Sequence, residues 1–209
     1  MREKINEFKY ILFHPEDGFY SMHIFKTGSV FISLVVALLW FFAELFTQQY
    51  TSFRYNNYNK TNINIIYIFI ATFIFAILFS VSNWAICTLF DGEGSFSEIL
   101  IVTGYSLFPY VSSRFIAIIM SYFLTINEST FVNFVTIIGL LYTVVLLCIG
   151  LIQIHDYSFT KMILSVFSTV IGVLLIVVLI FLLMTLFGQL FSFISSIFKE
   201  VAMHDYIGM

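Results

Sequence analysis

The densest polar run of the chain holds the side chains best suited to bind a ligand or a partner. It reads Asp-Gly-Glu-Gly-Ser-Phe-Ser-Glu over residues 91–98 and lies between two apolar stretches. Ser95 and Glu98 have the S-x-x-E spacing of a capping box, which predicts that a helix begins immediately after Ser95. The simplest interpretation is therefore a helix cap in a reversal between two membrane spans. The sharper hypothesis is that Asp91 and Glu93 also bind a cation or a basic partner, although further ligands of a calcium loop are missing.

A second polar run, residues 155–158, follows the fourth apolar stretch and precedes Lys161. Its simplest interpretation is an interfacial turn anchored by Tyr157. Turns that follow the second and the fourth of five spans lie on the same side of a membrane, so the two polar runs can meet. We therefore expect a partner-binding surface in the internal loops, with pairing of His155 or Lys161 with the acids as a refinement. The candidate residues are Asp91, Glu93, His155 and Asp156.

A transition-metal site is a weaker alternative at the same place. It would need His14 and Asp17 from the beginning of the chain to converge with the two polar runs. No H-x-x-E-H or H-E-x-x-H spacing occurs, so the sequence gives no metal motif. We therefore predict no metal and no cofactor.

Two opposite charges lie deep within apolar stretches. Glu44 and Arg114 are costly in hydrocarbon unless they pair, so we predict a Glu44–Arg114 ion pair. The alternative is that Arg114 extends toward the membrane surface while Glu44 faces water. Pro109 lies near the middle of the same stretch as Arg114 and predicts a helix break, with half-helices at 96–108 and 110–124. Interrupted helices with buried charges often line solute pathways, so a small transporter or channel is an alternative function.

Several other functions lack their motifs. There is no G-x-S-x-G elbow, no P-loop and no pair of aspartates within the apolar stretches. Cys87 and Cys148 both fall inside apolar stretches, which argues against a disulfide framework. The net charge of -3 and the lack of a Lys/Arg cluster argue against a nucleic-acid partner. We therefore predict a non-enzymatic protein.

Five apolar stretches must position these residues, and they occupy most of the 209-residue chain. Each is long enough to cross a hydrocarbon layer of about 30 Å as a helix. The composition agrees, with 60% hydrophobic and 10% charged residues. We predict an all-α integral membrane bundle, with residues 28–209 as one membrane domain. Its five transmembrane helices are expected at about 28–49, 63–90, 99–126, 131–154 and 161–191.

Residues 1–27 are more polar and precede the first span. Apolar residues recur there at helical spacing, as at Phe8 and Ile11, with charged residues between them. This pattern predicts a short amphipathic helix on the membrane surface. We expect Pro15 to end it and Asp17-Gly18 to form a turn. Such a segment leaves a lipid-handling or membrane-shaping role as a third alternative.

The distribution of basic residues predicts the orientation. Four of them precede the first span, whereas the next loop holds Arg54 and Lys60. The positive-inside rule then places the N-terminus in the cytoplasm and the C-terminus outside. Residues 59–61 also match an N-glycosylation sequon on the external side. Small residues at four-residue spacing, as at Ser113, Ala117 and Ser121, predict close helix packing, with a homo-oligomer face as the alternative.

Three segments together resemble the Yip family of five-span membrane proteins, and the bacterial branch most of all. They are Ser82-Asn83-Trp84, the run at 91–96, and the run Thr-Gly-Tyr-Ser-Leu-Phe-Pro-Tyr at 103–110. His14-Pro15, the run at 155–158 with Lys161, and Phe198-Lys199-Glu200 are similar to that branch as well. The resemblance covers about residues 10–200.

The resemblance implies five helices with the N-terminus in the cytoplasm. Eukaryotic members bind Rab-type GTPases through a long N-terminal region. This chain has only about 27 residues before its first span, so we do not expect it to bind such GTPases. Some bacterial members are encoded beside sugar-import transporter components. We therefore expect an accessory or scaffolding subunit in the bacterial inner membrane that binds another membrane protein or a transporter complex.

Overall fold

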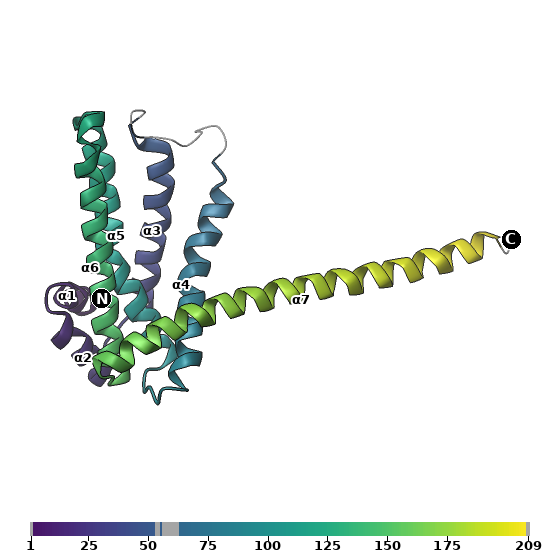
Figure 1. Ribbon diagram of the computed structural model, residues 1–209, viewed down its shortest axis with the longest axis horizontal. Helices are drawn as coiled ribbons and strands as arrows, with labels where there is room; N and C mark the ends of the chain where they lie inside the picture. Colours follow the sequence, from purple (N-terminus) through teal and green to yellow (C-terminus); the bar gives the residue numbers. More distant parts are fainter. Residues whose placement is uncertain (1, 53–54, 56–62, 208–209) are drawn as a thin grey trace.

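The computed structural model describes residues 2–52, 55 and 63–207, and these form helices without any strand. The sequon at 59–61 lies outside the described residues. Five helices are long and apolar enough to cross a membrane, which confirms the predicted all-α membrane bundle (Figure 1). The helices are α1 Arg2–Phe13, α2 Pro15–Phe25, α3 Val30–Tyr50, α4 Ile65–Cys87, α5 Phe96–Phe123, α6 Ser129–His155 and α7 Phe159–Ile207, with a 3-10 turn at Ile126–Glu128 before α6.

Helices α3 to α6 lie side by side, and α7 crosses the base of α4 and then projects away from them (Figure 1). Helix α5 is the centre, because it packs on α3, α4 and α6 and is the most buried of the five spans. We call the end with the turns after α4 and α6 the His155 end. The opposite end, where α3 and α5 finish, is the Tyr50 end.

Small residues allow the central helices to approach closely. A Cβ at Gly104 of α5 would lie 2.8 Å from Cα of Ser33 on α3, and one at Gly139 of α6 would lie 3.0 Å from the Pro109 carbonyl oxygen. The stripe of Ser113, Ala117 and Ser121 is buried within the bundle. In this structure the stripe therefore serves packing between α5 and its neighbours, not an exposed oligomer face.

The N-terminal segment differs from the prediction in two ways. The first helix ends at Phe13, before Pro15, as predicted, but a second helix follows at once, because Pro15 also begins α2. Proline suits the first position of a helix, where its missing N–H has no partner to lose, and Asp17 and Gly18 lie in the first turn of α2 rather than in a loop. Both helices also pack on the bundle, with Ile11 and Phe19 fully buried.

The predicted break at Pro109 is wrong, because α5 continues through the proline from Phe96 to Phe123. The neighbouring helix α6 supplies a hydrogen-bond partner at this point: the Tyr110 N–H donates to Thr143 Oγ1 at 3.1 Å. Membrane helices tolerate proline when neighbouring side chains satisfy the backbone groups that it disturbs. The half-helices at 96–108 and 110–124 are therefore one helix.

The Thr143 contact can be tested by substitution. Thr143→Val keeps the shape of the side chain and removes the Thr143 hydroxyl as an acceptor for the Tyr110 N–H, so we expect a loss of about 1–3 kcal/mol of stability. Thr136→Val is the matched control, since Thr136 Oγ1 bonds only to the Val132 carbonyl of its own helix. Thermal unfolding in detergent measures both. Equal midpoints for the two variants would show that α5 does not depend on Thr143.

Candidate functional site

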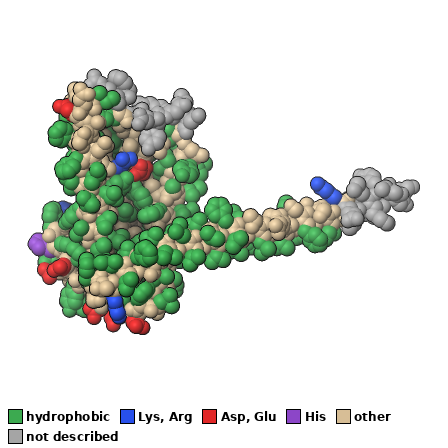
Figure 2. All heavy atoms as spheres, in the orientation of Figure 1, with side chains coloured by type: hydrophobic (Ala, Val, Ile, Leu, Met, Phe, Trp, Pro, Cys, Tyr) green, Lys and Arg blue, Asp and Glu red, His purple; other side chains and the backbone are tan. Residues whose placement is uncertain are grey.

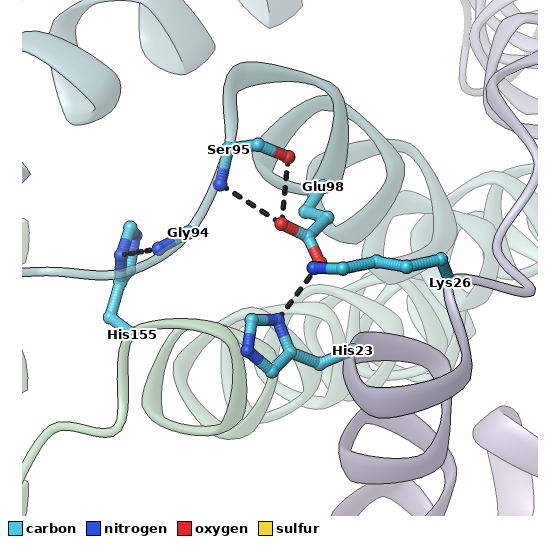
Figure 3. A network of polar contacts seen from close by, with 6 residues as sticks. All are labelled: His23, Lys26, Gly94, Ser95, Glu98 and His155. Carbon is cyan, nitrogen blue, oxygen red and sulfur yellow. Dashed lines mark hydrogen bonds and ion pairs between the residues drawn. The ribbon is translucent and has the colours of Figure 1, made fainter.

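The carboxylate of Glu98 lies at the centre of a polar cluster at the His155 end (Figure 3). Its Oε2 accepts hydrogen bonds from the Ser95 N–H at 2.9 Å and from Ser95 Oγ at 2.7 Å, so the predicted cap residues meet at the start of α5. Its Oε1 lies 2.8 Å from His23 Nδ1 and 2.6 Å from Lys26 Nζ. The Glu98 side chain is only 8% exposed. A buried charge is tolerated because both of its oxygens are engaged.

His155 forms the second part of the cluster and joins four segments of the chain. Its Nδ1 accepts from the Gly94 N–H at 3.1 Å, which assigns the proton to Nε2. Nε2 then donates to Asn83 Oδ1 at 3.2 Å, and Asn83 Nδ2 donates to Thr169 Oγ1 at 3.0 Å. The turn before α5, the end of α6, α4 and α7 are thereby connected through buried groups.

The two glycines of the polar run are required by the close approach of this histidine. A Cβ on Gly94 would lie 2.7 Å from His155 Cε1, and one on Gly92 would lie 2.7 Å from His155 Nδ1. Both distances are too short for a carbon atom to fit without movement of the imidazole ring. The Asp-Gly-Glu-Gly pattern is therefore explained by contact with α6, not only by a tight turn.

Tyr157 closes the cluster from the turn between α6 and α7. Its ring stacks on that of His155, with centroids 5.0 Å apart, and its hydroxyl donates to the Cys87 carbonyl at 3.4 Å. Burial raises the pKa of Tyr157 to about 12. The hydroxyl therefore stays protonated and keeps donating throughout the physiological pH range.

The four predicted partner-binding residues separate into two groups. Asp91, Glu93 and Asp156 are exposed at the His155 end, where Figure 2 shows acidic side chains together. His155 is 1% exposed, so a direct contact of its side chain with a partner is excluded in this structure. It bonds the backbone of Gly94 instead of pairing with an acid. Among the described residues, no group of three or more His, Cys, Asp or Glu side chains could hold a metal ion.

Glu44 and Arg114 lie together between α3 and α5, with Arg114 Nη2 3.0 Å from Glu44 Oε2. Trp40 Nε1 and the Tyr110 hydroxyl each donate to Glu44 Oε1 at 3.2 Å. The Arg114 side chain is 19% exposed and the Glu44 side chain 23%. Each charge thus has its counter-ion, as their cost in hydrocarbon requires.

Sequence reasoning missed His23 and Lys26 as members of the cluster. They lie 75 and 72 positions before Glu98, so no local spacing relates them to it. The available signal was that the capping box occupies one oxygen of Glu98 and leaves the other to be neutralised. Chemically, Glu98 and His155 have partners at both of their polar atoms, so they hold segments together and offer no free acid or base.

The model of one protein family, described as the Yip1 domain, matches residues 9–182. This match covers the last part of α1, all of α2 to α6 and the first half of α7, and it includes every residue of the polar cluster. No curated protein and no solved structure matches the chain.

The glycine contact predicts a strong effect of a small change. Gly94→Ala forces the His155 ring to move, and we expect it to cost about 1–3 kcal/mol of stability. Gly188→Ala is the control: Gly188 lies in α7 with nothing within 4 Å of the added Cβ, so it is expected to be neutral or stabilising. Thermal midpoints and hydrogen exchange of residues 88–95 report both changes. If Gly94→Ala unfolds no earlier than Gly188→Ala, the loop is not held by His155.

The Glu44–Arg114 pair predicts strong coupling between two substitutions. Arg114→Met or Glu44→Gln alone leaves the other member without its counter-ion, with an expected cost of about 3–5 kcal/mol. The double variant removes both charges and should therefore be more stable than either single variant. Thermal unfolding of the four proteins gives the coupling energy. Additive effects would mean that the two side chains do not interact in the membrane.

Proposed function

Because the chain belongs to the Yip family of multi-pass membrane proteins, we propose that it is a non-enzymatic accessory or scaffolding subunit. It binds another integral membrane protein or a transporter complex at its His155 end. The observation that carries this proposal is the turn between α4 and α5, which is held by buried hydrogen bonds and has exposed acidic side chains. Asp91 and Glu93 are exposed on a turn whose Gly94 and Glu98 are buried and hydrogen-bonded.

The lengths of the helices support an aqueous location for this turn. At 1.5 Å per residue, α5 and α6 are about 42 and 40 Å long, roughly 10 Å more than the hydrocarbon layer. The His155 end carries His23, Lys26 and Glu98, so this is the end that projects from the membrane. Counting about 20 residues from the Tyr50 end places the hydrocarbon boundary near Thr103 and Ile149.

Helix α1 then lies at the membrane boundary. Phe8 packs edge-on against Tyr105 and Phe108, with ring centroids 4.8 and 5.3 Å apart. These two residues follow Thr103 directly on α5. Exposed apolar residues of α1 and α2, such as Phe13 and Phe25, are suited to the headgroup region. Residues 1–27 therefore combine an interfacial role with packing on the 28–209 membrane domain.

We place the protein in the bacterial inner membrane, with its His155 end in the cytoplasm. Arg2, Lys4, Lys9 and Lys26 belong to the segment packed at this end, as the positive-inside rule requires. The apolar part of α7, Phe159–Lys199, is about 62 Å long, which is more than enough to cross about 30 Å of hydrocarbon. Figure 1 shows α7 running across the direction of α3 to α6, so a crossing requires α7 to turn toward that direction in the bilayer. We propose that it does so. The C-terminus is then outside the cytoplasm.

A rigid acidic surface suits recognition of a basic surface on a partner. Holding the turn in place lowers the entropy lost on binding, and exposed charges set orientation and association rate. The transporter alternative receives less support, because Glu44 and Arg114 neutralise each other and α5 is continuous at Pro109. It stays a prediction, as does a homo-oligomer.

The docking proposal is tested by removing charge without changing shape. Asp91 and Asp156 have positive φ angles of 56° and 51°, which asparagine tolerates. The triple variant Asp91→Asn, Glu93→Gln, Asp156→Asn should therefore fold normally. We expect it to recover about tenfold less of the partner, which corresponds to about 1.4 kcal/mol of binding free energy. Mild-detergent purification from the native host with quantitative mass spectrometry measures the recovery.

Glu16→Gln with Asp17→Asn is the matched control, since both residues are exposed acids of α2 near the same end. We expect this control to keep the partner at the wild-type ratio. Equal recovery with the triple variant and with the control would overturn the docking surface. Purification of the wild-type chain without any other membrane protein would overturn the accessory role itself.

A further inference from the structure

An elongated cavity of about 530 Å³ lies between α3, α4, α5 and α6, away from the polar cluster. One wall is α4, from Tyr67 to Phe79, and the other is α6, from Leu140 to Leu147. Its floor consists of α3 and α5 side chains, including Trp40 and Leu107. The proposed docking function makes no use of this cavity.

The cavity opens sideways between α4 and α6. Phe75 on one rim is 56% exposed, and Val144 on the other is 50% exposed. Exposed residues of α4 and α6 beside the opening are apolar, such as Ile74 and Leu141, so the opening faces lipid and not water. Apolar space in contact with lipid tails is filled by them, since an empty cavity forfeits dispersion contacts on all of its walls.

The inner surface of the cavity is apolar even where its residues carry hydroxyls. Thr72 Oγ1 donates to the Ile68 carbonyl, and Thr103 Oγ1 donates to the Ile99 carbonyl. Thr143 Oγ1 accepts from the Tyr110 N–H. These hydroxyls are occupied by backbone groups, so the deep part of the cavity suits a hydrocarbon ligand.

Glu44 and Tyr110 also line the cavity, and there the Glu44 carboxylate pairs with Arg114 and accepts from the Tyr110 hydroxyl. Two further polar side chains lie at the Tyr50 end of the cavity. Gln48 lies two residues before the end of α3, and Tyr67 lies two residues after the start of α4. Tyrosine prefers the level of the lipid headgroups, where one end of its ring is wet. A ligand with an apolar tail and a polar head therefore enters with its head at this end.

The length of the cavity matches one acyl chain. From Tyr67 to Phe79 the wall is about 18 Å long at helical rise, which compares with about 15 Å for the acyl layer of one leaflet. A cavity of about 530 Å³ that opens to lipid along its side is therefore suited to a chain of that leaflet.

We propose that this cavity is a binding site for one acyl chain of a phospholipid from the leaflet at the Tyr50 end. The chain lies parallel to α4 and α6, with its terminal methyl group toward Phe79. The headgroup stays at the membrane surface beside Gln48 and Tyr67. The bound lipid completes the α4–α6 side of the bundle.

The site is tested by filling it from the α4 wall. Ala71 lines the cavity, so Ala71→Trp places an indole where the acyl chain lies. Ala85→Trp is the matched control, because Ala85 is an exposed residue of the same helix and does not line the cavity. The full chain is purified after extensive detergent washing, and native mass spectrometry counts the phospholipids that it retains.

We expect the wild-type chain and Ala85→Trp to retain one phospholipid. For Ala71→Trp we expect the fraction of protein with a bound phospholipid to be at least tenfold lower. Val144→Trp fills the site from the α6 wall and is expected to act in the same way if Ala71→Trp does not fold. A phosphatidylcholine with a diazirine in one acyl chain should label wild-type peptides at 67–79 and 140–147 above other lipid-facing peptides. Labelling of these peptides should fall in Ala71→Trp but not in Ala85→Trp.

Three outcomes would overturn the proposal. Retention of lipid by both Ala71→Trp and Val144→Trp would place the bound lipid elsewhere. Photolabelling spread evenly over all lipid-facing helices would show no preferred site. A lipid-free dimer that dissociates when either tryptophan is introduced would show that a helix of a second copy fills the space. None of these outcomes depends on the acidic docking surface, whose variants leave the cavity unchanged.

Discussion

The carboxylate of Glu98 is the constraint on which the His155 end depends. It begins α5 by capping it, and through His23 and Lys26 it attaches the end of α2 to the central helix. A carboxylate this deeply buried would be strongly destabilising without partners, so α2 and α5 are positioned together or not at all. Because α2 leads directly into α3, the same contact also sets where the first span begins.

The histidine network extends this constraint to the other side of the bundle. His155 connects the turn before α5 to α4, and Asn83 continues the connection to Thr169 on α7. Buried polar networks of this kind specify one arrangement, since each unsatisfied member is costly. The result is a turn with a fixed backbone and exposed acids, which is the property that a recognition surface needs.

The membrane part of the bundle is held together differently. Lipid tails are as apolar as leucine, so helices there associate through close packing and a few polar contacts. Gly104 against Ser33, and Gly139 against Ser113 and Pro109, bring the backbones together around α5. Helix α7 crosses only the base of α4, where Gly172 approaches Ser82, and then departs (Figure 1). That departure leaves the space between α4 and α6 uncovered by protein, and it is this space that the lipid chain is proposed to occupy.

The sequence by itself determined the features that depend on composition or short spacing. A span must be long and apolar to cross hydrocarbon, so five helices followed from hydropathy, and the Ser95–Glu98 cap followed from four consecutive residues. The cost of a lone charge in lipid pointed to Glu44 and Arg114 as partners. Tertiary structure decided what distant segments supply: the cations for Glu98, the burial of His155, and the Thr143 hydroxyl that accepts from the Tyr110 N–H beside Pro109. The end of the first helix before Pro15 also followed from the sequence. The helix that begins at Pro15 did not, because Asp17-Gly18 suits a turn in isolation and becomes helical where α2 packs on the bundle.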